Sequence, residues 1–313
     1  MTVCLVTGGS GFIGSHICEG LIAAGHSVKV LDNLSSGRQE NLKRLEGKID
    51  FIEGDLLDPE ILNSAMKGVE IVLHQAAIAS VQISMDQPLM EHRTNSFGTL
   101  SILEAARKAD VRRVVFAASA SAYGDDPTIP KRESMFPRPV SPYAISKVSG
   151  EYYCRFYSRE YGIESICLRY FNVFGPRQHP ASPYSGVISI FINEMLKNKS
   201  PIIFGDGLQT RDFVYVKDIV SANLLACEIQ RADGQIYNVG SGQSTDLLEL
   251  IAVLNRIMGT TIVPEMTSER SGDIRESLAD INFAMTELGY EPSTNLEFGL
   301  AQVVDWMSQD KMI

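Results

Sequence analysis

The sequence is poor in basic residues and in long apolar runs, and both shortages argue against whole classes of function. It holds 28 lysines and arginines against 38 aspartates and glutamates, with a formal net charge of −10, and the basic residues form no dense runs. Nucleic acid and anionic membranes are therefore poor candidate partners. No apolar stretch approaches the ~20 residues of a membrane-spanning helix, and the first residues lack the features of a secretory signal. These absences predict a cytoplasmic protein.

Cysteine is scarce as well. The five cysteines show no CxxC motif and no regular spacing: Cys4, Cys18, Cys154, Cys167 and Cys227. Several lie within apolar strand or helix patterns, so buried and reduced thiols are a better interpretation than a zinc site or disulfides. We predict no metal site.

The first half of the chain alternates short β-branched runs with helical patterns near residues 12–24, 58–66, 88–108 and 142–161. The expected strands are Val3–Thr7, Ser27–Leu31, Ile49–Glu53, Ile71–His74, Val114–Ala118 and Ser165–Arg169. Continuous apolar strands separated by helices are typical of a parallel sheet that is covered on both faces. The pattern therefore predicts an α/β protein with a doubly wound parallel sheet, the Rossmann fold.

The pattern loosens after about Gly175, where three prolines mark an irregular stretch before a helix near 187–198 and short strands. No linker is long enough to separate independent domains. We therefore predict a dinucleotide-binding Rossmann domain over residues 1–175 and a smaller substrate-binding region over residues 176–313, with some segments exchanged between the two.

A glycine-rich turn follows the first strand, and a helical pattern opens directly after it. Gly8 permits the tight turn, Gly11 lets a pyrophosphate approach the helix N-terminus, and Gly14 allows close packing of helix on strand. Asp32, about 20 residues further on, suits the hydroxyls of an adenosine ribose and would repel a 2′-phosphate. NAD is thus favoured over NADP, although Arg38 could tolerate that phosphate. A glycine turn without any ligand is the alternative, which the strand–turn–helix context disfavours.

A second group of residues indicates a catalytic function. Ser141 and Pro142 suit an N-cap and a first helical residue, so Tyr143 and Lys147 lie one turn apart on one helix face. We expect the ammonium to lower the pKa of the tyrosine, which could then remove a proton from a substrate hydroxyl while hydride leaves the same carbon. The YxxxK pattern alone is common in amphipathic helices. Together with the glycine turn and with Ser119, at the end of an upstream strand, it indicates an enzyme.

The GxxGxxG spacing resembles that of the extended short-chain dehydrogenase/reductases, and further motifs of that family follow in order along nearly the whole chain. The resemblance implies that Ser119, Tyr143 and Lys147 are catalytic. It also implies NAD contacts from the glycine turn and from the ends of several strands and helices: Gly8, Gly11, Phe12, Ile13, Gly14, Asp32, Asn33, Ser36, Gly37, Asp55, Leu56, Gln75, Ala76, Ala77, Asn95, Tyr143, Lys147 and Tyr170.

The resemblance narrows to the sugar-nucleotide enzymes of the family, which implies a UDP-sugar substrate. Phe204 is then expected beneath the uracil ring, with Arg211 and Arg270 on the diphosphate. A surface salt bridge is the alternative for each arginine. The implied substrate contacts are Ser80, Ser119, Ser121, Tyr143, Asn172, Val187, Phe204, Arg211, Arg270, Asp273 and Ser277.

The reaction type follows from a missing carboxylate. Sugar-nucleotide 4,6-dehydratases and glucuronate decarboxylases of the family carry acidic residues directly after the active-site hydroxyl, where this chain has Ala120-Ser121. The resemblance therefore implies a 4-epimerase, in which hydride leaves C4 and returns to the opposite face of a 4-ketose. Ser277 stands where related epimerases carry a bulky tyrosine or a small residue. A small residue favours UDP-GlcNAc/UDP-GalNAc, with UDP-Glc/UDP-Gal also possible.

The helices near 88–108 and 142–161 carry apolar residues on more than one face. Because relatives build a four-helix bundle from such helices across a twofold axis, the resemblance implies a homodimer; thick core packing is the alternative. Three other functions stay open: a 4-epimerase of uronic-acid nucleotides, another sugar-nucleotide oxidoreductase, and a non-catalytic NAD-binding regulator. A regulator would be expected to lack one of Ser119, Tyr143 and Lys147, all of which are present.

Overall fold

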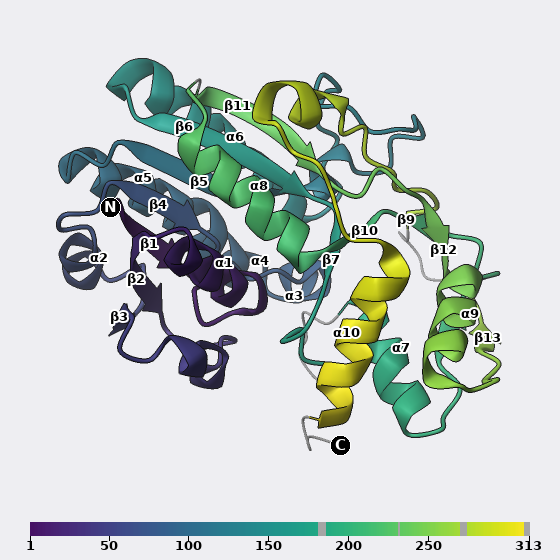
Figure 1. The fold of residues 1–313 in the computed structure, drawn as a ribbon. Helices are drawn as coiled ribbons and strands as arrows, with labels where there is room; N and C mark the ends of the chain where they lie inside the picture. Colours follow the sequence, from purple (N-terminus) through teal and green to yellow (C-terminus); the bar gives the residue numbers. More distant parts are fainter. Residues whose placement is uncertain (181–185, 231, 270–273, 310–313) are drawn as a thin grey trace.

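The computed structural model describes residues 1–180, 186–230, 232–269 and 274–309. Its centre is a seven-stranded sheet whose neighbouring strands are all parallel (Figure 1). The predicted doubly wound α/β fold is confirmed, because the strand order reverses direction between β1 and β4. In the order β11-β6-β5-β4-β1-β2-β3 the strands are Asp233–Val239, Glu164–Tyr170, Arg113–Ser119, Ile71–His74, Val3–Thr7, Ser27–Asp32 and Ile49–Glu53.

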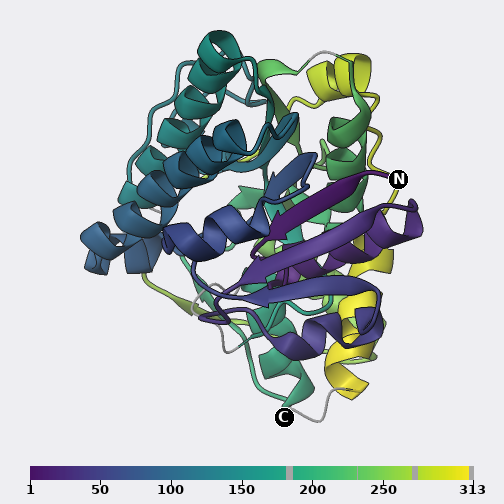
Figure 2. The same cartoon turned by 90° about the vertical axis from the view of Figure 1, so that its left-hand side faces the viewer.

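Helices cover both faces of the sheet (Figure 2). On one face lie α1 (Phe12–Ala23) and α8 (Val216–Glu228), and on the other lie α2 (Pro59–Ala65), α5 (Gly98–Lys108) and α6 (Pro142–Tyr161). Strand β1 shows why two cores form. Its alternate side chains point in opposite directions, so Cys4 and Val6 join the core with α1 and α8, whereas Leu5 joins the core with α5 and α6.

The single helix predicted near 88–108 is interrupted. It consists of α4 (Pro88–His92), the π-helical turn η2 (Arg93–Phe97) and α5, and the short helix α3 (Val81–Asp86) precedes it. A π turn inserts one extra residue into the helical repeat and is often found at functional sites. Here it contains Asn95.

The later part of the chain forms a third core beside the sheet, around α7, α9 and α10. The division at residue 175 stays a prediction, and the central sheet takes its edge strand β11 and its covering helix α8 from beyond it. The remaining elements are η1 (Gln39–Leu45), η3 (Ala120–Tyr123), β7 (Asn172–Phe174), α7 (Val187–Leu196), β8 (Ile202–Phe204), β9 (Thr210–Arg211), β10 (Phe213–Tyr215), β12 (Thr245–Asp246), α9 (Leu247–Met258), β13 (Glu265–Thr267), η4 (Ala284–Leu288) and α10 (Leu296–Gln309).

All five cysteines are buried thiols. Within the described ranges, no helix combines the length and the apolarity that crossing a bilayer requires.

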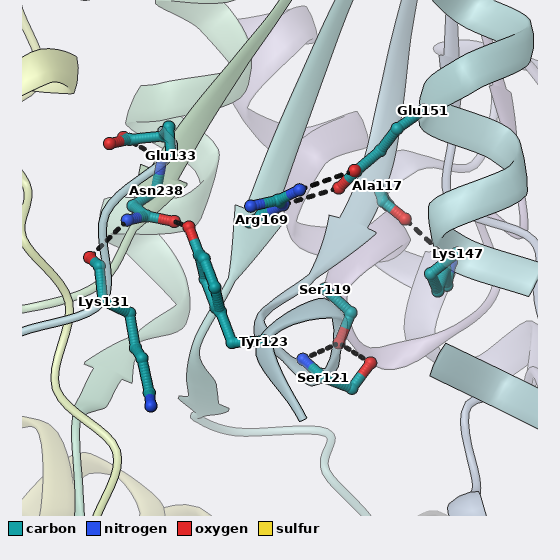
Figure 3. A network of polar contacts seen from close by, with 10 residues as sticks. All are labelled: Ala117, Ser119, Ser121, Tyr123, Lys131, Glu133, Lys147, Glu151, Arg169 and Asn238. Atoms are coloured by element: carbon teal, nitrogen blue, oxygen red, sulfur yellow. Dashed lines mark hydrogen bonds and ion pairs between the residues drawn. The ribbon is translucent and has the colours of Figure 1, made fainter. Parts of the chain in front are cut away.

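A buried ion pair joins α6 to β6 (Figure 3). The guanidinium of Arg169 donates two hydrogen bonds of 2.7 Å to the carboxylate of Glu151, and both side chains are at most 3% exposed. The same guanidinium lies 4.7 Å from the ring centre of Tyr123, whose hydroxyl donates to Asn238 Oδ1 at 2.6 Å. Since Asn238 belongs to β11, this network connects α6 with the last two strands of the sheet.

We predict that Glu151→Leu lowers the free energy of unfolding by about 3–5 kcal/mol, because it leaves a buried guanidinium without its counter-charge. The double variant Glu151→Leu/Arg169→Met should recover most of that loss in urea unfolding followed by circular dichroism. As a matched control, removing the exposed pair Arg256–Glu297, 3.3 Å apart, should change the stability by less than about 1 kcal/mol. Equal stability of the single and double variants would contradict the prediction.

Candidate functional site

A cavity of about 780 Å³ runs along the carboxyl ends of the central strands, across the point where the strand order reverses. Ligands of doubly wound proteins bind in this crevice. Most of the predicted site residues line it: Gly8, Gly11, Phe12, Ile13, Gly14, Asp32, Asn33, Ser36, Gly37, Asp55, Leu56, Gln75, Ala76, Ala77, Ser119, Tyr143, Lys147, Tyr170 and Asn172.

The glycine turn brings α1 unusually close to the sheet. Gly8 has a φ of +70°, and a Cβ atom on it would lie 2.7 Å from the backbone nitrogen of Ala76. A Cβ atom on Gly14 would lie 2.2 Å from the carbonyl oxygen of Gly8. No described side chain caps the N-terminus of α1, which begins after Gly11 at the cavity wall. Its first N–H groups therefore suit an anionic pyrophosphate.

Asp32 ends β2 and is 7% exposed. Its carboxylate accepts hydrogen bonds from the backbone nitrogens of Ser10 at 2.9 Å and Leu34 at 2.8 Å. Burial raises the pKa of Asp32, while these two hydrogen bonds lower it. Each carboxylate oxygen keeps room for a further donor, as recognition of ribose hydroxyls requires. A Cβ atom on Gly37 would lie 3.0 Å from both oxygens, so this glycine leaves space beside the carboxylate. Together with the glycine turn, Asp32 fits a dinucleotide.

The three predicted catalytic side chains converge on the same cavity. Ser141 caps α6, because its hydroxyl accepts a hydrogen bond from the Ala144 nitrogen at 3.2 Å, and Tyr143 and Lys147 follow on the first turns. Lys147 Nζ donates to the carbonyl oxygen of Ala117 at 2.7 Å and lies 5.8 Å from the centre of the Tyr143 ring. Figure 3 shows this lysine reaching from α6 to β5, with Ser119 at the end of that strand.

The expected lowering of the Tyr143 pKa is wrong for the chain by itself. Burial raises the pKa of Tyr143, the hydroxyl of Ser119 opposes that change, and the carboxylate of Glu91 adds to it. Burial also lowers the pKa of Lys147 to about 8, against the effect of Glu91 and Glu151. Attraction between ammonium and phenolate alone would lower the pKa of the tyrosine, but both groups also lose solvation inside the protein, and this loss has the larger effect on Tyr143.

Asn95, Ser80 and Ser121 stand behind the cavity wall. The side-chain amide of Asn95 accepts a hydrogen bond from the Ile78 nitrogen at 2.8 Å and donates one to the Ile78 oxygen at 3.0 Å, and Ile78 lines the cavity. Ser80 caps α3, and its hydroxyl accepts from a backbone nitrogen. The hydroxyl of Ser121 donates to Ser119 Oγ at 2.9 Å (Figure 3). Asn95 and Ser121 thus support groups that do face the cavity.

Four other predicted substrate contacts lie farther along the chain, within the described residues, and do not line the cavity: Val187, Phe204, Arg211 and Ser277. Phe204 ends β8 and Val187 begins α7, while Arg211 lies in β9 and donates to the Ile274 oxygen at 2.6 Å. The backbone nitrogen of Ser277 donates to the Thr210 oxygen at 3.2 Å, so Ser277 and Arg211 belong to one small substructure. Arg270 and Asp273 lie outside the described residues.

Part of the cavity wall was not predicted from the sequence, chiefly Arg177, Gln178 and His179. Arg177 has a φ of +72°, and its guanidinium bonds Ser15 Oγ at 3.1 Å and the carboxylate of Glu19, both on α1. A cation thus lies beside the helix that carries the glycine turn. The signal in the sequence was a basic residue two positions after Gly175, in a stretch without regular periodicity.

The described ranges contain no cluster of histidine, cysteine or acidic side chains that could hold a metal ion.

Comparisons of the sequence with a family model and with known proteins indicate the same family. The model of the NAD dependent epimerase/dehydratase family matches residues 4–240. A putative UDP-glucose 4-epimerase of Methanocaldococcus jannaschii is 43% identical over 98% of both chains.

Two solved structures are similar over nearly their whole length. The UDP-glucose 4-epimerase of Thermotoga maritima, in a structure with UDP-glucose, is 42% identical with a TM-score of 0.93 and covers 98% of this chain and 99% of its own. The UDP-N-acetylglucosamine 4-epimerase of Methanobrevibacter ruminantium, in complex with UDP-N-acetylmuramic acid, is 39% identical with a TM-score of 0.94 and covers 98% of both chains.

Proposed function

Because this chain belongs to the NAD dependent epimerase/dehydratase family, we propose that it is an NAD-dependent isomerase that inverts C4 of the hexose in a UDP-sugar. The observation that carries the proposal is the convergence of Ser119, Tyr143 and Lys147 on a cavity whose other end is the glycine turn. A proton acceptor, its neighbouring cation and an aligning hydroxyl thus share one space with a dinucleotide site.

Each group has a role that follows from its place. NAD+, when bound, would supply the acceptor for the C4 hydride and the donor that restores it. Tyr143 takes the proton of the C4 hydroxyl, Ser119 aligns that oxygen, and the ammonium of Lys147 stabilises the phenolate. The first turn of α1 holds the pyrophosphate, and Asp32 holds the adenosine ribose. The 4-ketose turns about its diphosphate before the hydride returns to its other face.

The substrates that we propose are UDP-GlcNAc and UDP-GalNAc, with UDP-Glc and UDP-Gal as further candidates. The small side chain of Ser277 and the likeness to the Methanobrevibacter enzyme support an acetamido sugar. Asn172, Phe204 and Arg211, with Arg270 and Asp273 beyond the described residues, would hold the nucleotide part. Ala120 places no carboxylate next to Ser119, so the chain lacks the added acid–base group that elimination or decarboxylation would need there.

The purified protein, incubated separately with UDP-Glc, UDP-GlcNAc and UDP-GlcA without added cofactor, should convert the first two into their C4 epimers, as separated by chromatography. Tyr143→Phe should lower kcat by roughly a thousandfold, because it removes the proton acceptor. The matched control Tyr153→Phe, on the same helix but outside the cavity wall, should keep kcat within about twofold. Conversion of none of the three sugars by protein with spectroscopically confirmed dinucleotide would contradict the proposal.

Ser277→Tyr should suppress conversion of UDP-GlcNAc while it spares UDP-Glc, since a bulky side chain competes with the acetamido group for space. A fall in kcat/KM of at least about tenfold for the acetamido sugar alone corresponds to a steric penalty of roughly 1.4 kcal/mol. Ser277→Ala serves as the control and should keep both activities. An equal loss of activity on both sugars after the tyrosine substitution would contradict the proposed role of Ser277 in substrate selection.

We also propose that the protein is a homodimer that packs through η2, α5 and α6. Large apolar side chains on η2 and α6, next to α5, are exposed: Phe97, Ile145, Tyr152, Phe156 and Tyr161. Burying such a patch is the usual way in which a stable dimer forms.

In sedimentation analysis, the unmodified protein should have twice the mass of the chain, and Tyr152→Glu/Phe156→Glu should have the mass of one chain because it places two charges in the interface. The control Val263→Glu changes a residue that is 73% exposed in a loop away from these helices, and it should stay dimeric. A monomeric unmodified protein would contradict the dimer.

A further inference from the structure

Glu91 is a fully buried carboxylate to which the mechanism above gives no role. It lies in α4 and is 0% exposed. Carboxylates are almost never removed from water to this extent unless something inside the protein compensates them. Its Oε2 atom has no hydrogen-bond partner among the described residues. The compensation must therefore come from contacts of Oε1 and from nearby charge.

The Oε1 atom of Glu91 joins two parts of the active site. It accepts a hydrogen bond from the hydroxyl of Ser146 at 2.6 Å and another from the side-chain nitrogen of Asn95. Ser146 lies on α6 between Tyr143 and Lys147. Asn95 lies in the π turn, and its amide holds the backbone of Ile78 at the cavity wall. One carboxylate oxygen thus connects the catalytic helix with the wall of the cofactor cavity.

The charged groups around Lys147 also indicate a role for Glu91. The carboxylates that face this lysine are Glu91 and Glu151. Glu151 is already neutralised by its two hydrogen bonds from Arg169. His74 faces Lys147 from β4, and because burial lowers the pKa of His74 to about 3, its ring is neutral.

Glu91 is therefore the carboxylate near Lys147 whose charge no described arginine balances. On its own helix segment, His92 and Arg93 are exposed. On α6, the titratable group that it also faces is Tyr143.

We propose that Glu91 is a positioning residue for the reaction: its buried carboxylate is the counter-charge of Lys147, and its hydrogen bonds hold Ser146 and Asn95 in place. The inference rests on the proposed function, because it assigns Tyr143 and Lys147 to proton transfer. Glu91 itself touches neither the reacting atoms nor the cavity, and it acts through the groups that do.

The negative charge of Glu91 shifts the pKa values of Lys147 and Tyr143 in a predictable direction, which its hydrogen bonds to Ser146 and Asn95 alone would not do. A nearby anion stabilises the ammonium of Lys147 and destabilises the phenolate of Tyr143, so it raises the pKa of both groups. Glu91→Gln keeps the shape and removes the charge. Both pKa values should then fall, so the acid and the alkaline limb of the pH dependence of kcat should both move to lower pH.

We expect Glu91→Gln to move the acid and the alkaline limb of the kcat profile to lower pH by about one unit each. Ser146→Ala is the matched control, since it removes a hydrogen bond to Glu91 and keeps the charge. It should lower kcat and leave the limbs in place. If Glu91→Gln lowers kcat equally at every pH, the carboxylate is only structural and the proposal is overturned.

A second measurement needs no sugar turnover. The titration of Tyr143 is read from the ultraviolet tyrosinate band as the difference between each protein and its Tyr143→Phe counterpart. Tyr143 should titrate at lower pH in Glu91→Gln than in the unmodified protein, and an unchanged titration would overturn the proposal. An inactive unmodified protein would instead contradict the proposed function, so the two failures are distinguishable.

If Glu91→Gln does not fold, Glu91→Asp makes the same test. The shorter side chain draws the carboxylate away from Lys147, so the tyrosinate titration and both limbs should move in the same direction by a smaller amount. Unmoved values in a folded Glu91→Asp protein would overturn the proposal.

Discussion

The close approach of α1 to β1 is the constraint on which the site depends. Without side chains at Gly8 and Gly14, the helix starts directly against the strand end. The turn between them then organises the next strand as well, because the backbone of Ser10 donates to Asp32 and accepts from Arg38 and from Asn41. The positions that we propose for the pyrophosphate and the ribose are thus set by a single turn.

A second theme is the competition between burial and charge. Tyr143 and Lys147 both lose solvation in the cavity wall, and burial alone makes each group harder to ionise. Fixed groups offset part of this loss: the Ala117 carbonyl accepts a hydrogen bond from Lys147, and the Ser119 hydroxyl lowers the pKa of Tyr143. The buried carboxylate of Glu91 stabilises the ammonium of Lys147 but not the phenolate of Tyr143. Because these partners come from β5 and α4, the environment of Tyr143 and Lys147 depends on the packing of α6 against both.

Much of the fold was predictable, because six strands of the parallel sheet are short runs rich in apolar and β-branched residues, separated by helical patterns, and the glycine turn has a specific spacing. Strand β11 was not, since polar residues such as Gln235 and Asn238 interrupt its apolar residues and it pairs on one side only. The π turn around Asn95 could not be predicted from the sequence either, because one extra residue hardly changes the spacing of apolar residues in a helix. For the site, it was easier to predict which residues take part than to predict the surroundings that set their pKa values. The sequence predicted that Tyr143 and Lys147 would meet, but desolvation and the contribution of Glu91 arise from parts of the chain that only folding brings together.

The origin of β11 has a consequence for how the chain matures on the ribosome. Synthesis delivers β6 long before residues 233–239, so the growing sheet ends in a strand with unpaired amides and carbonyls during that interval. A nascent chain in this state exposes an edge on which other chains can assemble. The first 175 residues also lack α8, whose Ile219, Ala222 and Ala226 complete the core on one face of the sheet. A gene split at that point would therefore separate the nucleotide-binding strands from part of their own core.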